Sequence, residues 1–191
     1  MLLQIIFLSL AFAFSTSALK VEGPCRYNEI TVMKNLDLNA YSGLWYEIER
    51  YDLPLRQNSD CIKFDIKSEN GNEIYSTETG FNYFNGQNYE IKGQGMKEDG
   101  VDAKLRFWYE NQQEPQDTNY WVLDTDYKNF AIVWGCKNLE DGNSEEYYTL
   151  MSREKKITSN RDVRKRVMEV IDQAEVDVRY IRITVQEDDV C

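Results

Sequence analysis

The sequence GLWYEIERY at residues 43–51 decides the fold. It holds three aromatic residues and one isoleucine, a composition typical of a β-strand. It begins with a glycine, which permits a close approach of the backbone to another segment. Further strand-like segments follow at residues 61–68, 73–81, 87–97, 103–109, 119–124, 129–137 and 145–152. The chain is therefore predicted to be all-β.

Turn signals separate these segments at short intervals. Pairs of Asn or Asp with Gly between strand-like runs favour tight hairpins, and hence antiparallel pairing of neighbours in sequence. Pro54 and the stretch around Pro115 mark longer connections. The turn pairs are Asn70-Gly71, Asn85-Gly86, Asp99-Gly100 and Asp141-Gly142.

One segment near the C-terminus has helical rather than strand periodicity. Apolar residues recur at helical spacing after Ser159, and Ser159 with Asp162 resembles a capping box. A short strand is expected at residues 178–185. Meandering strands with one late helix favour an eight-stranded antiparallel up-and-down barrel that packs the helix on its outside. The apolar helix residues are Val163, Val167, Val170, Ile171 and Ala174.

Residues 1–18 resemble a secretory signal peptide, with an apolar core at residues 5–14 and small residues at Thr16-Ser17-Ala18. No Lys or Arg precedes the core, so a retained membrane anchor is the competing interpretation, although the apolar run is short for a bilayer span. Residues 19–191 then form a single domain, which we expect to be secreted and not stably inserted in a membrane.

The bulk composition excludes several classes of function. A net charge of −11 argues against nucleic acid and anionic membranes as partners. The chain has no histidine, which excludes serine–histidine and cysteine–histidine catalysis and histidine-ligated haem. Four cysteines in a secreted chain imply two disulfides with three connectivities, and their spacing does not suit a metal site.

Three segments, taken in order, resemble the signature segments of the lipocalins. They are residues 43–47, Thr125-Asp126-Tyr127 and Arg153, and the resemblance extends over nearly all of residues 19–191. Residues 35–49 and 120–127 most resemble the apolipoprotein D and insect bilin-binding (insecticyanin-like) branch. The resemblance implies a barrel closed at one end that holds a small hydrophobic ligand.

The resemblance also assigns structural roles. Trp45 plugs the narrow end of the barrel, Gly43 allows a close approach there, and Arg153 stacks over Trp45. Thr125, Asp126 and Tyr127 turn the chain near the same end, with Asp126 accepting hydrogen bonds from local amides. The implied disulfides are Cys25–Cys136 and Cys61–Cys191.

Strand parity and the family pattern together nominate residues that line the cavity. If Trp45 points inward, Glu47 and Glu49 follow it while Ile48 faces out, under the helix. One β-bulge would reverse this parity, and the aromatic residues could instead simply fill the barrel. Thr149 and Met151 lie on the same strand face as Arg153 and are further candidates. The family pattern adds Phe64, Ile66, Thr77, Thr79, Phe107, Tyr109 and Tyr120.

Glu47 is the most informative of these candidates, because a carboxylate inside a barrel needs a partner or a raised pKa. It could accept hydrogen bonds from pyrrole nitrogens or a ligand hydroxyl. Pairing with a nearby Lys or Arg, or with buried water, is the preferred interpretation.

Aromatic residues with a few hydroxyls and carboxylates suit a flat, conjugated ligand with polar ends. The resemblance favours a biliverdin-type tetrapyrrole, held non-covalently because the implied disulfides use all four cysteines. A carrier of lipid, steroid, fatty acid or carotenoid is the alternative, and a scavenger of amines or bioactive lipids is another. Enzymatic activity is not expected, because Glu47 and Glu49 show no matched acid and base. Association into homo-oligomers through exposed barrel faces stays open.

Overall fold

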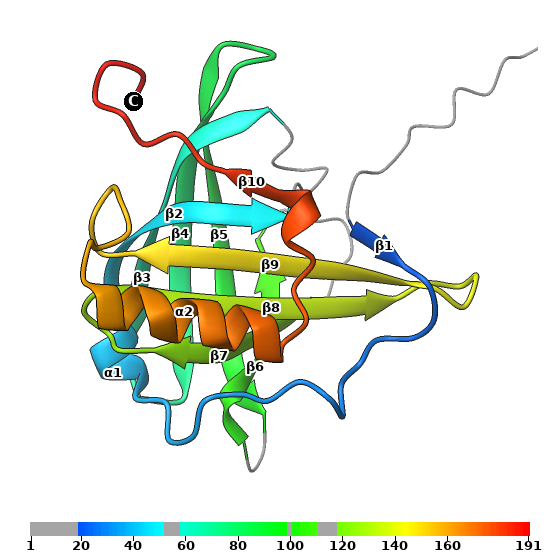
Figure 1. Cartoon of the computed structure of the whole chain (residues 1–191). Coiled ribbons are helices and arrows are strands. Elements are labelled where there is room, and N and C mark those ends of the chain that lie inside the picture. Colours follow the sequence, from blue (N-terminus) through cyan, green and yellow to red (C-terminus); the bar gives the residue numbers. More distant parts are fainter. Residues whose placement is uncertain (1–18, 52–57, 99–100, 111–117) are drawn as a thin grey trace, which may run out of the picture.

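Eight antiparallel strands pair with their neighbours in sequence, and the last returns to the first to close a barrel (Figure 1). The computed structural model describes residues 19–51, 58–98, 101–110 and 118–191. The predicted leader, the Asp99-Gly100 turn, Pro54 and the stretch around Pro115 lie outside these residues. The barrel strands are β2 (Gly43–Tyr51), β3 (Ser59–Ser68), β4 (Glu73–Asn82), β5 (Gln87–Glu98), β6 (Val101–Tyr109), β7 (Thr118–Thr125), β8 (Phe130–Asn138) and β9 (Ser144–Ser152).

These strands confirm the predicted fold. Three of the predicted turn glycines, Gly71, Gly86 and Gly142, have φ between +67° and +82°, a left-handed conformation that glycine adopts without strain. The barrel closes through β2 and β9, which pair from Tyr46 opposite Ser152 to Arg50 opposite Thr149.

The barrel wall separates two apolar clusters, because successive side chains of a strand point to opposite faces. On β8, Ala131 and Val133 belong to the inner cluster, whereas Ile132 and Trp134 belong to the outer one. The outer cluster also contains Ile48, as predicted. One barrel therefore supports an inner lumen and a separate outer core.

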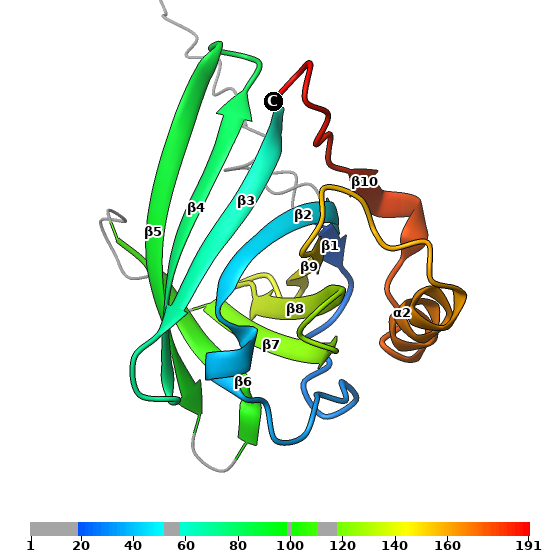
Figure 2. The same ribbon diagram turned by 90° about the vertical axis from the view of Figure 1, so that its left-hand side faces the viewer.

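Helix α2 (Arg161–Gln173) covers the outer cluster (Figure 2). Val167 and Ile171 are buried against the barrel, as the helical periodicity predicted. The predicted cap is wrong by one residue: Asn160 Oδ1, not Ser159, accepts from the amides of Asp162 and Val163 at 2.9 and 3.4 Å.

Four small elements complete the fold, three of which had no clear sequence signal. Strand β1 (Leu19–Val21) pairs with β9, and helix α1 (Leu38–Tyr41) lies at the start of β2. The predicted strand at 178–185 is shorter than expected, because Val178–Tyr180 form the 3-10 helix η2 before β10 (Ile181–Ile183) pairs with β2.

The C-terminal segment completes the wall between β2 and β3. These two strands pair only from Gly43 to Tyr46, and residues 184–186 fill the space beyond. The Thr184 amide donates to Ile48 O and the Cys61 amide donates to Val185 O, both at 2.9 Å. The disulfide Cys61–Cys191 fastens this segment to β3. The other disulfide joins Cys25 and Cys136, so the structure has the connectivity that the resemblance implied.

The base of the barrel is closed by Trp45, whose side chain is fully buried. The Arg153 guanidinium lies 3.6 Å from the centre of the Trp45 ring and donates to the carbonyls of Leu44 and Ser42, each at 2.9 Å. Gly43 has φ +107°, and a β-carbon there would lie 3.1 Å from Arg153 Nη1. Glycine is therefore required beside the stacked arginine.

The turn at residues 125–127 lies at the same end. Thr125 Oγ1 donates to Phe130 O at 2.6 Å and accepts from the Tyr127 amide at 2.9 Å. Asp126 Oδ1 accepts from the amides of Lys128, Asn129 and Phe130, as predicted. Arg153 Nε donates to Tyr127 O at 3.0 Å and so ties this turn to the base.

Candidate functional site

The lumen of the barrel is closed at the base and becomes accessible toward the opposite end, the mouth. On β8, Ala131 is fully buried, whereas Val133, two residues nearer the mouth, is 8% exposed. Two residues nearer the mouth than buried Met151 on β9, Thr149 is partly exposed. On β7, Val122 is buried and Tyr120, two residues nearer the mouth, is partly exposed. On these three strands the inner side chains are therefore less completely covered toward the mouth than at the base.

Most of the predicted lining residues point into the lumen. Phe64, Ile66, Phe107 and Met151 belong to the inner cluster, and Tyr109 and Tyr120 pack against it. Thr149 lies opposite Arg50 and Val133, and residues paired across neighbouring strands share one face. Ligand contact by these residues stays a prediction.

The predicted inward orientation of Thr77 and Thr79 is wrong. Thr77 lies opposite Asp65 and Lys92 on the outer face of the sheet. Its neighbour Ser76 lies opposite the inward-facing Ile66 instead. Thr79 is opposite Lys63 and Glu90, and both of these residues are exposed. The inward residues of β4 are Ile74, Ser76, Glu78 and Gly80.

An aromatic wall forms where β5, β6 and β7 meet. Phe107 stacks on Tyr120 with ring centres 5.4 Å apart and meets Tyr109 edge-on at 5.1 Å. The Phe107 ring lies directly over Gly93 and Gly95, where a β-carbon would come within 2.4 and 2.9 Å of it. Because the glycines let the ring lie against the strand, the aromatic surface lines the lumen instead of crossing it.

The wall ends in a pair of hydrogen-bonded phenols near the base. The hydroxyls of Tyr41 and Tyr120 are 2.8 Å apart, and the Tyr41 carbonyl accepts from Trp45 Nε1 at 2.8 Å. Burial, together with the neighbouring Tyr120, raises the pKa of Tyr41 well above its usual range. Tyr41 therefore presents an uncharged hydroxyl group at neutral pH.

Glu47 lies in the lumen as predicted, and it is paired with a cation. Arg50 Nη1 donates to Glu47 Oε1 at 2.6 Å, and Thr184 Oγ1 donates to the same oxygen at 2.7 Å. The side chains of Glu47 and Arg50 are both fully buried. The preferred interpretation of Glu47 as half of an internal ion pair is confirmed by this geometry.

A β-bulge explains why Arg50 rather than Glu49 reaches Glu47. The pairing of β2 with β9 slips between Glu47 and Glu49, so the strand parity reverses at Ile48. Glu49 therefore points outward, where it accepts from the Tyr148 hydroxyl at 3.5 Å, and burial raises its pKa. The predicted inward orientation of Glu49 is wrong for this reason.

A second carboxylate on the inner face, Glu78, was not predicted from the sequence. Its side chain is 2% exposed, and Glu78 Oε1 accepts from the Tyr89 hydroxyl at 3.0 Å. Tyr89 lies opposite Gly80 on the neighbouring strand, and a β-carbon at Gly80 would come within 2.6 Å of the Tyr89 oxygen. The tyrosine therefore folds over a glycine to reach Glu78.

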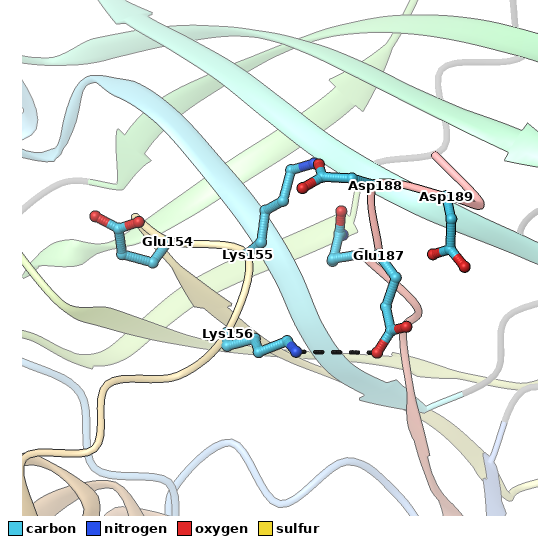
Figure 3. Close-up of a pocket in the computed structure, with 7 residues that line it drawn as sticks. Glu154, Lys155, Lys156, Glu187, Asp188 and Asp189 are labelled. Carbon is cyan, nitrogen blue, oxygen red and sulfur yellow. Dashed lines mark hydrogen bonds and ion pairs between the residues drawn. The ribbon is translucent and has the colours of Figure 1, made fainter.

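A hollow outside the barrel is lined by charged side chains, unlike the largely apolar lumen (Figure 3). It lies between the segment that follows β9 and the C-terminal segment, and charged residues dominate its lining. Lys156 faces Glu187 at 3.9 Å, and Lys155 pairs with Asp188. These solvated ion pairs do not suit an apolar ligand, so the lumen is the candidate site.

The described residues offer no group of three or more acidic or cysteine side chains placed to hold a metal ion. Within the same part of the chain, no helix is long and apolar enough to cross a membrane.

Sequence reasoning missed Glu78, Tyr89, Arg50 and the C-terminal residues that reach the lumen. The spacing of Gly80, Gly93 and Gly95 is the signal that could have identified the β4–β5 wall, because glycine within a strand often marks a close approach by another group. Arg50 points into the lumen because of the β-bulge at Ile48, and no residue type in this segment predicts that bulge.

A comparison with protein-family models matches residues 36–186 to the model described as a lipocalin-like domain. Among curated proteins, retinol-binding protein 4 of Gallus gallus is 28% identical over 156 residues, covering 77% of this chain and 76% of that protein. Apolipoprotein D of Macaca fascicularis is 27% identical over 163 residues, covering 82% and 80% respectively.

Solved structures of the same shape are more distant in sequence. Insecticyanin from the tobacco hornworm Manduca sexta has a TM-score of 0.78 at 19% identity, covering 91% of this chain and 92% of that one. Lobster apocrustacyanin A1 has a TM-score of 0.74 at 21% identity, covering 89% and 92%. The tryptamine complex of the amine-binding protein of Rhodnius prolixus has a TM-score of 0.64 at 16% identity, covering 88% and 92%. At these identities the similarity establishes the fold alone.

Proposed function

The chain belongs to the lipocalin-like family, and from this premise we propose that it carries one small hydrophobic molecule in the lumen of its barrel. The observation that carries the proposal is the exposure of inward-facing side chains, which rises from the base toward the mouth on β7, β8 and β9. A concave apolar site with a few polar groups is the usual form of a small-molecule site. The relative named for retinol, at 28% identity, is consistent with such a ligand.

We propose further that the ligand is flat and conjugated, and a biliverdin-type tetrapyrrole is the first choice. Phe107, Tyr109 and Tyr120 offer an aromatic wall on which a planar molecule can stack. The hydroxyls of Tyr41 and Thr149 and the carboxylate of Glu78 supply polar partners on the same inner face. A carotenoid, retinoid, steroid or fatty acid is the alternative class of cargo.

Such a bilin would be bound without a covalent bond, because both pairs of cysteines are in disulfides. The protein purified from its native source should then show strong near-ultraviolet and red absorption bands. Extraction with acidified organic solvent should remove the colour completely, and the extract should have the mass of a tetrapyrrole. Pigment that stays on the denatured protein would contradict non-covalent binding, and a colourless protein that yields a fatty acid would contradict the bilin.

We also propose that the protein is extracellular and acts as a carrier rather than as a catalyst. Disulfides persist in oxidising compartments and are rare in the cytosol, which supports secretion. The described charged groups of the lumen include one tight ion pair, Glu47 with Arg50, and neither partner is set up as a matched acid or base.

A further inference from the structure

We propose that the Phe107 ring, which lies flat over Gly93 and Gly95, sets the width of the lumen and thereby selects the shape of the cargo. This inference rests on the proposed carrier function and concerns the same site. The cargo class is a broad planar molecule with several rings side by side, rather than a single extended chain. Gly93 and Gly95 are the specificity-determining residues, because they keep the ring out of the space that such a molecule needs.

The orientation of the Phe107 ring is the first argument. Phe107 belongs to the inner cluster and lies on β6 opposite Gly95. A β-carbon at Gly93 would lie 2.4 Å from Cε1 of the ring, and one at Gly95 would lie 2.9 Å from Cδ2. Cε1 and Cδ2 are opposite atoms of a phenyl ring, so both ends of the ring lie against β5. The ring therefore follows the strand and does not project toward the axis of the barrel.

The second argument is that glycine is otherwise unfavourable at both positions. Inside a strand it has no side chain to pack, and it loses more backbone freedom on folding than any other residue. Gly93 and Gly95 do not have the positive φ that favours glycine elsewhere in the chain. The room that the two glycines leave for the Phe107 ring is therefore the steric reason for their presence.

An alanine at position 93 would move the ring into the lumen. Carbon atoms in contact lie about 3.5 Å apart, so a distance of 2.4 Å requires a shift of about 1 Å. Strand β5 lies behind the ring, and the Tyr109 and Tyr120 rings lie beside it with centres at 5.1 and 5.4 Å. With these groups behind and beside it, the ring moves away from β5 and toward the axis of the barrel.

Such a shift affects broad and narrow molecules differently. A single hydrocarbon chain is flexible and can bend past a displaced ring. A rigid plane of several rings cannot bend, and adding bulk to a closely packed site then excludes it. The glycines therefore matter for a broad cargo and have little effect on a narrow one.

The test uses two probes titrated by fluorescence: biliverdin, which is broad, and cis-parinaric acid, a fatty acid with a single polyene chain. Gly93→Ala should lower the affinity for biliverdin by about tenfold or more, the size expected when a filled site is overpacked. The affinity for cis-parinaric acid should stay within about threefold of its original value. The matched control is Lys92→Ala, the exposed neighbour on the outer face of β5, which should leave both affinities unchanged.

Phe107→Ala provides an independent background, because it removes the ring that an alanine at position 93 would displace. The double variant Gly93→Ala/Phe107→Ala should bind biliverdin within about threefold of Phe107→Ala alone. If Gly93→Ala does not fold, Gly95→Ala takes its place, because its β-carbon would meet the same ring less closely, at 2.9 Å. It should lower the affinity for biliverdin about threefold and leave that for cis-parinaric acid unchanged.

An equal loss for both probes in the glycine variant, or no loss for biliverdin, would overturn the role of the ring. A double variant that binds biliverdin about tenfold more weakly than Phe107→Ala would overturn it as well. Unmodified protein that binds cis-parinaric acid but not biliverdin would overturn the broad cargo and leave the carrier function intact. Failure to bind either probe would overturn both proposals.

Discussion

Replacing Trp45 by alanine should lower the free energy of unfolding by about 3–5 kcal/mol, which is the usual cost of removing a buried aromatic side chain. Trp45 is fully buried at the base of the barrel, and Arg153 and Tyr41 pack on its ring. The loss includes the stacking of Arg153, worth about 0.5–2 kcal/mol, and the hydrogen bond from Trp45 Nε1 to Tyr41 O. Urea denaturation followed by circular dichroism measures this change.

Trp108→Ala is the matched control. Trp108 is partly exposed and lies on the outer face of β6, between the inward-facing Phe107 and Tyr109. Its replacement should cost clearly less than that of Trp45. Equal losses for the two variants would show that Trp45 does not have a special role as the plug of the base.

Replacing Arg50 by methionine should cost about 3–5 kcal/mol, because it leaves the buried Glu47 carboxylate without its counter-ion. The double variant Glu47→Met/Arg50→Met removes both charges and should recover most of that loss, since an apolar pair of similar volume is often as stable as a buried ion pair. Equilibrium urea denaturation of the two single variants and the double variant gives the coupling directly.

The exposed pair of Arg179 and Asp177 is the control for this cycle. Its side chains lie 2.5 Å apart, but that of Arg179 is 79% exposed. Arg179→Met should leave the denaturation midpoint almost unchanged, because solvent screens exposed pairs. A double variant at Glu47 and Arg50 as unstable as Arg50→Met alone would mean that the loss comes from packing and not from the uncompensated charge.

The strand order could be predicted because it depends on local sequence, and the closed base could be predicted because its residues match the signature segments of the family. Asn-Gly and Asp-Gly pairs between strand-like runs favour hairpins, whereas the roles of Gly43, Trp45 and Arg153 came from the resemblance to the lipocalins. The eight barrel strands accordingly lie within two residues of their predicted bounds. Local chemistry was sufficient for the strands and their turns.

The lining of the lumen was harder to predict, for two physical reasons. The family pattern placed Thr77 on the inner face, whereas the register of β4 with β3 turns Ser76 and Glu78 inward and Thr77 outward. A bulge at Ile48 then reverses the parity of β2 and brings Arg50 to Glu47. The third partner, Thr184, comes from a segment more than 130 residues away in sequence, and its contact depends on tertiary structure alone.

The central claim is that the ligand lies inside the barrel, and two neighbouring residues of β4 test it most directly. Ser76→Phe adds a ring on the inner face, whereas Thr77→Phe adds the same ring on the outer face. Native mass spectrometry with biliverdin and with retinol, on variants shown to be folded by their melting curves, counts the bound ligand. We expect one ligand per chain for the unmodified protein and for Thr77→Phe, and strongly reduced occupancy for Ser76→Phe. Equal occupancy in the two variants would contradict binding in the lumen.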